Sequence, residues 1–497
     1  MATSLTTGRP WRVILAFSIP LLIGNVVQQL YQFADAIVVG RHLGVNSLAA
    51  VGATGSLLFL LLGFAWGVTS GFAIPTAQAY GARDAAGVRR SVAAGTVLTG
   101  ILSILLTIVA PLVSEPALRL MQTPPELLAE ATVFTQISFL GASAMMAFNY
   151  LAAIVRAIGD SRTPLIFLSI SCVLNVGLVV LMVGPLGWGV AGAALATVVA
   201  QVISVLMCLE FVRRRLQDLK VSRADFRAVT KADLGEHLRI GLPMGFQASI
   251  IAIGTLTVQV ALNTLGADAV AAYTTGSRVD GLAVALLSSL GLAVSMYVAQ
   301  NHGGKRPDRI RKGVVEATWM SIIAAVVLGA LLVAFGTPMI RLFVGEGSDN
   351  VVEMAHLMLI INGLSYSALA VLFVLRGALQ GLGHTLIPTV TGVIELVMRV
   401  AAAIILGALL DFTGVALSNT LAWVGAAALL IPAYIKEHRR LAKLPIEPDE
   451  PTLTTPIAIV GPVDGSMNVD AVVTTTQPIA VVKKSSTRML RRREPQR

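Results

Sequence analysis

One acidic side chain, Asp35, lies inside the first long apolar segment, which runs from Val13 to about Gly40. An ionised carboxylate at that depth in a bilayer is costly unless it is paired, hydrated or protonated. Such a group can load and unload a proton, and the same oxygens can bind a cation instead. We therefore predict that Asp35 is an ion-coupling residue. The alternative is a carboxylate that neighbouring side chains hold for helix packing.

Polar side chains precede this aspartate by one to two helical turns. Gln28, Gln29 and Tyr31 stand there together with Gln32, in a segment that is otherwise apolar. They give the helix a polar stripe beside its lipid-facing side, and a polar stripe inside a membrane usually lines a cavity. We predict that Gln28, Gln29 and Tyr31 face a substrate cavity.

Two further polar residues, Asn175 and Thr197, lie in the fifth and sixth apolar segments. Both side chains can solvate Asp35 or an ion beside it, so we include them in the predicted coupling site. The alternative is that each forms a hydrogen bond between helices, which is a common use of Asn and Thr in membranes. Spacing alone does not decide between these two roles.

The second half of the chain carries other charges inside its apolar segments. Glu395 and Arg399 are four residues apart on one helix face and can pair, and Arg278 and Asp280 lie well inside an earlier segment. Arg278 and Arg399 are the obvious intramembrane bases. We expect a structural ion network, and a substrate-facing role is the alternative.

Two prolines, Pro20 and Pro243, occupy matching places in the first helix of each half. A proline in a spanning helix frees a carbonyl and permits a bend. We predict that both positions are hinges, with a static kink as the alternative.

The composition is that of a multi-pass membrane protein. The chain has 497 residues, of which 55% are hydrophobic and 13% charged. Apolar runs of about 20 residues recur about twelve times between residues 13 and 436, long enough for helices and unlike the alternating strands of a barrel. The net charge of +10 is concentrated in residues 213–239 and 436–497, as expected of cytoplasmic segments. A nucleic-acid partner is not expected.

The chain also repeats itself at an offset of about 222 residues. Residues 43–50 match 265–272, and 77–83 match 299–305, and the repeat places Thr257 opposite the first-helix aspartate. Each half then holds six helices, so we predict an all-α integral membrane fold of two pseudo-symmetric bundles that rock about a shared cavity. The predicted parts are a cytoplasmic N-terminus (1–12), an N-lobe (13–213), a cytoplasmic linker (214–236), a C-lobe (237–436) and a disordered basic tail (437–497).

Motifs for other chemistry are missing from the sequence. It contains no Walker A motif, and its six histidines are scattered without metal-ligand spacing. Cys172 and Cys208 both lie in apolar segments, so a structural disulfide is not expected. We predict no enzyme activity, no cofactor and no firm metal site, with the energy coming from an ion gradient or a partner.

Several motifs resemble the multidrug and toxic compound extrusion (MATE) family, nearest its DinF-like branch, and the resemblance covers about residues 12–436. The motifs are Ala34-Asp-Ala-Ile-Val-Val-Gly40, Ala77-Gln-Ala-Tyr-Gly81, Arg156-Ala-Ile-Gly-Asp160, Gly189-Val-Ala-Gly-Ala-Ala194, Val298-Ala-Gln300 and Gln380-Gly-Leu-Gly383. The resemblance implies a V-shaped pair of six-helix bundles that exports organic cations and other amphiphiles by alternating access in exchange for H⁺ or Na⁺.

The same resemblance assigns roles within the predicted coupling site. Asp35, Asn175 and Thr197 match the family's first-helix aspartate, fifth-helix asparagine and sixth-helix threonine. The sequence departs from the pattern at Val179, where some relatives carry an Asp, and at Ala152, where an asparagine is replaced. Fewer oxygen ligands favour H⁺ over Na⁺ as the coupling ion.

We expect a monomer in the cell (plasma) membrane with both termini in the cytoplasm. A lipid-linked precursor flippase of the same wider superfamily is the alternative function, but it would need a strongly basic cavity. A lipid-modifying enzyme would need a metal or diphosphate motif, and a receptor or scaffold would leave Asp35 and the repeat unexplained.

Overall fold

The computed structural model describes residues 4–344 and 348–446, and these residues are helical almost throughout, with no strand among them. The long helices are α1 (Pro10–Leu43), α2 (Val45–Gly81), α3 (Ala85–Leu120), α4 (Pro125–Leu140), α5 (Ala142–Ala157), α6 (Arg162–Val183), α7 (Gly189–Arg215), α9 (Lys231–Asn263), α10 (Ala267–Gly303), α11 (Pro307–Arg341), α12 (Asp349–Gly381) and α13 (Leu386–Leu441). Two short ones, η1 (Gln217–Leu219) and α8 (Arg223–Arg227), lie between α7 and α9.

Ten helices in the described part of the chain are long and apolar enough to cross a membrane. The pair α4 and α5, bent by 47° at its junction, supplies an eleventh span. α13 is itself broken at Asp411, whose backbone (φ 50°, ψ −134°) is not helical. Because a left-handed φ at a residue other than glycine interrupts a right-handed helix, we count residues 386–410 and 412–441 as two spans. The described residues then contain twelve.

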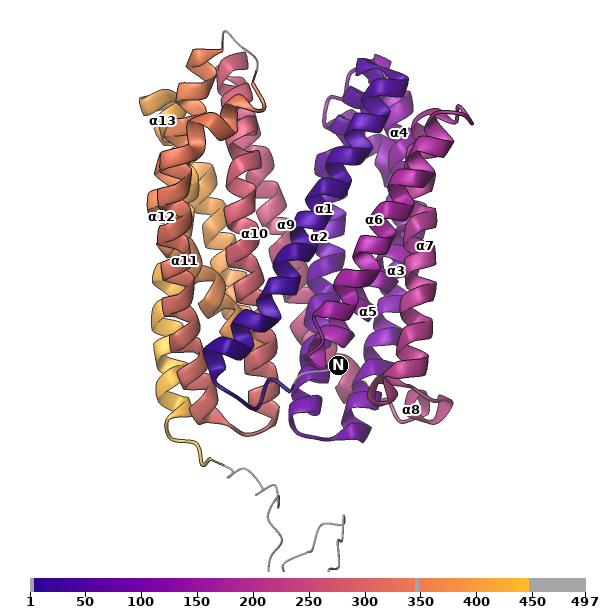
Figure 1. Ribbon diagram of the computed structural model, residues 1–497, viewed down its shortest axis with the longest axis vertical. Helices are drawn as coiled ribbons and strands as arrows, with labels where there is room; N and C mark the ends of the chain where they lie inside the picture. The colour runs from indigo at the N-terminus through magenta and orange to yellow at the C-terminus, as the bar shows by residue number, and fades with distance from the viewer. Residues whose placement is uncertain (1–3, 345–347, 447–497) are drawn as a thin grey trace, which may run out of the picture. The chain divides into compact units, whose positions relative to one another are not determined.

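The spans form two lobes, which we call the N-lobe (α1–α7) and the C-lobe (α9–α13), and which together make one contact unit, Met1–Glu447 (Figure 1). The two lobes meet chiefly where α2 packs along α9 and α10. α1 crosses between them, because it contacts α10 and α11 of the C-lobe as well as α6 of the N-lobe.

The helix boundaries extend the predicted lobes. α9 begins at Lys231, before the predicted start of the C-lobe at 237, and α13 continues past 436 to Leu441. The predicted tail from residue 447 onward lies outside the described residues.

The ends of the helices at residues 81–85, 157–162, 215–231, 303–307 and 381–386 will be called the linker end, because the segment between α7 and α9 lies there. That segment is locked by two capping boxes, in which Ser222 pairs with Asp225 and Thr230 with Asp233. Each acid also faces an arginine of α3, at 3.5 Å from Arg89 to Asp225 and 3.3 Å from Arg90 to Asp233.

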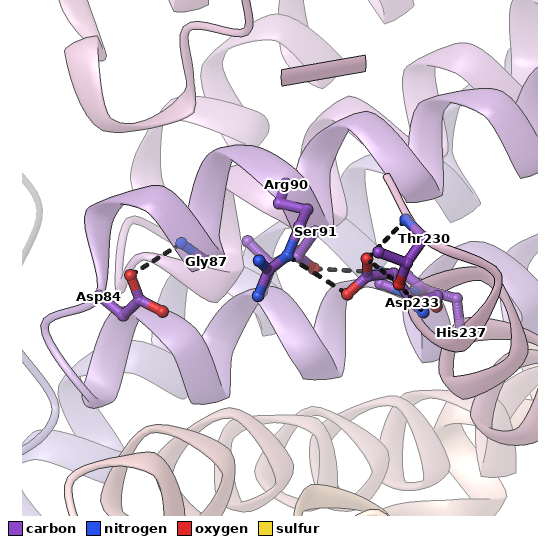
Figure 2. Close-up of polar contacts among 8 residues, drawn as sticks. Asp84, Gly87, Arg90, Ser91, Thr230, Asp233 and His237 are labelled. Atoms are coloured by element: carbon purple, nitrogen blue, oxygen red, sulfur yellow. Dashed lines mark hydrogen bonds and ion pairs between the residues drawn. The ribbon is translucent and has the colours of Figure 1, made fainter. Parts of the chain in front are cut away.

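The contact between Arg90 and Asp233 fastens the start of α9 to α3 (Figure 2). Both ring nitrogens of His237 are hydrogen-bonded. Nδ1 donates to the carbonyl of Asp233 at 2.7 Å, and Nε2 accepts from the hydroxyl of Ser91 at 3.0 Å. Hydrogen bonds from Ser222, with the nearby arginine, lower the pKa of the Asp225 carboxyl. The first turn of the C-lobe is therefore tied to the N-lobe by charge and hydrogen bonds.

A pair of equivalent hydrogen bonds joins the lobes at the linker end. Gln78 of α2 donates to the carbonyl of Gly381 at 3.0 Å, and Gln300 of α10 donates to the carbonyl of Ala157 at 2.7 Å. Gln78 and Gln300 occupy corresponding positions of the sequence repeat, as do Ala157 and Gly381. We call these two bonds the glutamine seam.

Close backbone contact accompanies the seam. A Cβ atom built on Gly81 would stand 1.8 Å from the carbonyl oxygen of Gln300, and one built on Gly303 would stand 1.8 Å from that of Gln78. Because no side chain fits at these distances, glycine at both places allows the lobes to touch backbone to backbone.

The segment before α1 also lies at the seam, where it is hydrogen-bonded to residues of the C-lobe. The backbone N–H of Leu5 donates to Oε1 of Gln300 at 3.0 Å, and the Leu5 carbonyl accepts from Asn301 at 3.1 Å. Arg309 donates to the carbonyl of Gly8 at 2.9 Å. Gln300 therefore bonds to the N-lobe and to the N-terminal segment at the same time.

Candidate functional site

The predicted coupling residues lie on three neighbouring helices of the N-lobe. Tyr31 and Asp35 are one turn apart on α1, so they share a face, and α1 packs along α6 and α7. The Tyr31 hydroxyl donates to Oγ1 of Thr197 at 3.2 Å, and Nδ2 of Asn175 donates to the same oxygen at 3.1 Å. The structure thus brings Tyr31, Asn175 and Thr197 into direct contact beside Asp35.

Two acceptor oxygens of this cluster have no donor. Thr197 uses its own proton on the carbonyl of Ala193 at 3.2 Å and accepts from both neighbours. Oδ1 of Asp35 and Oδ1 of Asn175 are buried, with no hydrogen-bond partner among the described residues. A buried acceptor without a donor is costly, and a proton or a small cation would relieve that cost.

The other predicted cavity residues of α1 differ from Tyr31. The side chains of Gln28 and Gln29 are exposed, and neither makes a hydrogen bond with the described residues. Their place in a substrate cavity stays a prediction.

In the C-lobe, Glu395 holds two arginines. Its Oε1 receives Arg399 at 3.0 Å, the predicted pair on α13, and its Oε2 receives Arg376 of α12 at 2.8 Å. All three side chains are buried. The expectation of only two obvious intramembrane bases was therefore incomplete, since Arg376 is a third. An arginine within the apolar run of α12 was the signal in the sequence.

Asp280 belongs to a second buried cluster of the C-lobe. Its Oδ1 accepts from Nδ2 of Asn362 at 3.0 Å and from the hydroxyl of Tyr366 at 2.5 Å. Asn362 and Tyr366 are one turn apart on α12 and were not singled out from the sequence. Arg278 joins neither cluster, and its guanidinium carbon instead lies over the ring of Phe33, 5.3 Å from the ring centre.

The two hinge candidates lie within continuous helices, α1 and α9. Pro243 lacks the N–H that would bond to the carbonyl of Arg239. The hydroxyl of Thr385 donates to that carbonyl at 3.0 Å, and Thr389 donates to the carbonyl of Pro243 at 3.2 Å. The hydrogen bond that α9 lacks at Pro243 is therefore replaced by one from Thr385, at the start of α13.

The part of the chain that the structure describes contains no group of three His, Cys, Asp or Glu residues that could hold a metal ion. Cys172 and Cys208 are free thiols. The ionisable side chains singled out in the spans therefore belong to the N-lobe cluster around Asp35 and to the two C-lobe clusters, with Arg278 apart from them.

Apolar spans in two similar lobes, with ionisable groups buried inside each, define a multi-pass membrane transporter. The chain belongs to the MatE family, whose model matches residues 20–181 and 243–410. It is 30% identical over 390 residues to the probable multidrug resistance protein YoeA of Bacillus subtilis, covering 77% of this chain and 84% of that protein. It is 21% identical over 406 residues to the FAD transporter of Shewanella oneidensis, covering 80% of this chain and 88% of that protein.

The fold also matches that of a solved structure. A solved structure described as the outward-facing conformation of a multidrug resistance MATE family transporter matches with a TM-score of 0.83 at 23% identity, covering 89% of this chain and 99% of that one. The all-α membrane fold and the family resemblance are thereby confirmed. The chain is a membrane transporter of this family and not an enzyme.

Proposed function

We propose that this protein exports organic cations and other amphiphiles across the plasma membrane in exchange for H⁺, with Asp35 as the coupling carboxylate. The observation that supports this most is the buried Oδ1 of Asp35, which has no donor among the described residues. A proton on this oxygen would remove the negative charge, whereas in the deprotonated state Oδ1 carries charge in a buried position without a donor. Loading and unloading a proton would therefore shift the balance between conformations that stabilise the two protonation states of Asp35 differently.

The ligand set favours H⁺ over Na⁺. Thr197 already accepts two hydrogen bonds, which leaves the oxygens of Asp35 and Asn175 as the main free acceptors of the cluster. Val179 and Ala152, where relatives can offer polar groups, are buried apolar residues here. A bound Na⁺ would lack the several oxygens that replace its water, but a proton needs only one or two acceptors.

We further propose that the linker end faces the cytoplasm and that the protein works as a monomer. The arginines of the α2–α3, α5–α6 and α7–α9 connections lie at that end, as the positive-inside rule requires of a cytoplasmic side. On this orientation the glutamine seam closes the cytoplasmic side, and the start of α1 lies there as well.

Efflux from proteoliposomes under an imposed pH gradient tests the coupling role. Asp35→Asn should abolish gradient-driven transport of rhodamine 123 while dye binding survives, because the amide cannot exchange a proton. Asp268→Asn is the matched control, since that exposed aspartate near the start of α10 accepts a hydrogen bond from Asn350 and makes no hydrogen bond with the described residues of the cluster.

Unchanged transport by Asp35→Asn would exclude Asp35 as the coupling site. Transport that follows a Na⁺ gradient and ignores pH would replace H⁺ with Na⁺. If neither gradient moved any organic compound, the lipid-linked precursor flippase would become the better function.

A further inference from the structure

Several ionisable side chains lie deep within the described spans, and among them Arg278 is exposed. At about 1.5 Å per residue, it lies about 16 Å along α10 from Ala267. The other deep ionisable groups are buried or half-buried, and they are Asp35, Asp280, Arg376, Glu395 and Arg399. Because a charged side chain at this depth avoids lipid, the exposure of Arg278 indicates that it faces a space open to water.

The contact with Phe33 shows which way Arg278 points. Phe33 lies on α1 two residues from both Tyr31 and Asp35, so on a helix it projects from roughly the opposite side. Tyr31 faces Thr197 of the N-lobe, whereas Phe33 meets Arg278 of the C-lobe. Arg278 thus spans the boundary between the lobes on the side of α1 that faces away from the Asp35 cluster.

The cation–π contact with Phe33 leaves the N–H donors of the guanidinium unused. A ring engages the flat face of an arginine, while its five N–H donors lie in the plane and match a carboxylate, phosphate or sulfonate in two-point contact. No hydrogen bond or ion pair with the described residues occupies those donors. The clustered arginines behave differently, since Arg376 and Arg399 both bond to Glu395.

The charge of the surrounding lobe supports an anionic ligand. Arg278, Arg376 and Arg399 outnumber Asp280 and Glu395 among the deep charges of the C-lobe. The only acid of this depth in the described N-lobe, Asp35, has its free oxygen buried on the other side of α1. The accessible charge that a ligand between the lobes would contact is therefore the guanidinium of Arg278.

We propose that Arg278 binds the anionic group of zwitterionic and anionic amphiphiles carried by this transporter, with Phe33 contacting the guanidinium and packing against the apolar part of the ligand. This role extends the substrate class beyond organic cations and rests on the proposed export function. Arg278 would then be a specificity residue, and the coupling chemistry would stay with the Asp35 cluster.

Two dyes that share a xanthene ring but differ in charge test this role. Proteoliposomes holding the full chain would be assayed for gradient-driven transport of carboxyfluorescein, an anion, and of rhodamine 123, a cation. The wild type should carry both. Arg278→Gln should raise KM for carboxyfluorescein about tenfold or more, because a charged two-point contact is lost, and should leave KM for rhodamine 123 within about twofold.

Arg278→Lys should give an intermediate KM for the anion, because it keeps the charge and loses the planar fork. Arg119→Gln is the matched control, since Arg119 pairs with Glu115 on the exposed surface of α3. Equal loss of both dyes in Arg278→Gln, or wild-type transport of rhodamine 123 alone, would overturn the anion-binding role and leave the export function intact. Transport of neither dye by the wild type would overturn both proposals.

Discussion

At the scale of single residues, the best-defined interaction inside the membrane spans is the one that Glu395 makes. One carboxylate pairs with Arg399 on its own helix and with Arg376 on α12. Nε of each arginine is buried without a hydrogen-bond partner among the described residues. The cluster therefore depends on the charge of Glu395 more than on complete hydrogen bonding.

Removing that charge should destabilise the protein strongly. Glu395→Gln leaves two buried arginines without a counter-ion, and breaking a buried ion pair in this way costs about 3–5 kcal/mol. Thermal unfolding in detergent would measure the loss as a lower midpoint, with Glu353→Gln as the control because Glu353 is exposed.

A companion variant separates charge from packing. Replacing Arg376, Glu395 and Arg399 together by methionine should recover much of the stability, because no charge is then left unpaired. A midpoint for Glu395→Gln equal to that of the control would contradict the view that this ion cluster holds the C-lobe together.

Sequence spacing predicted only the part of these clusters that lies on one helix. Glu395 and Arg399 were visible as a pair because four residues make one turn. Arg376 and the partners of Asp280, Asn362 and Tyr366, come from another helix. Helical periodicity identifies the face on which a residue lies, but not which helix packs against that face.

At the scale of elements, α9 continues across Pro243, and a residue at the start of α13 supplies the hydrogen bond that the proline cannot make. The carbonyl that the proline frees, that of Arg239, accepts from Thr385 at the start of α13. The sequence revealed the proline and its repeat partner Pro20. It could not reveal Thr385, which is 146 residues away and adjacent only in the folded C-lobe.

Removing this hydroxyl should loosen α9 at the proline. Thr385→Val deletes one hydrogen bond and leaves the Arg239 carbonyl unsatisfied, a loss of about 1–3 kcal/mol. The unfolding midpoint in detergent should fall accordingly. Thr255→Val is the matched control on α9, because the Thr255 hydroxyl bonds only to the carbonyl of Ile251 in its own helix. Equal midpoints in the two variants would show that Thr385 does not support the proline site.

At the scale of the whole molecule, the glutamine seam and its two glycines decide how closely the lobes meet at the linker end. The sequence repeat identified Gln78 and Gln300 as equivalent, and it predicted two similar bundles. It gave no sign that each glutamine would bond across to the other lobe, since a repeat relates positions and does not report contacts. The same holds for Gly81 and Gly303, whose need to be glycine comes from the opposite lobe.

A methyl group on either glycine should open the linker end. Gly81→Ala places a carbon where the carbonyl oxygen of Gln300 lies 1.8 Å away, and ordinary contact needs about 3.5 Å. Spin labels on the exposed residues Ala86 and Arg439, measured by double electron–electron resonance, should show a longer-distance population than in the parent chain. Gly303→Ala should have the same effect.

Gly100→Ala provides the control within the N-lobe, because a Cβ on Gly100 would meet nothing within 4 Å. A distance distribution unchanged in Gly81→Ala and Gly303→Ala would show that the lobes are held at this end by other contacts.

The seam also has the form of an isologous dimer interface contained in one polypeptide. Each half donates one glutamine side chain and offers one carbonyl, at 3.0 Å in one direction and 2.7 Å in the other. In a twofold homodimer, residue i of one subunit contacts residue j of the other, and j contacts i in return. A six-helix ancestor with one such glutamine, one such carbonyl and one such glycine could therefore have paired with its own copy, before gene duplication and a charged linker made the association permanent.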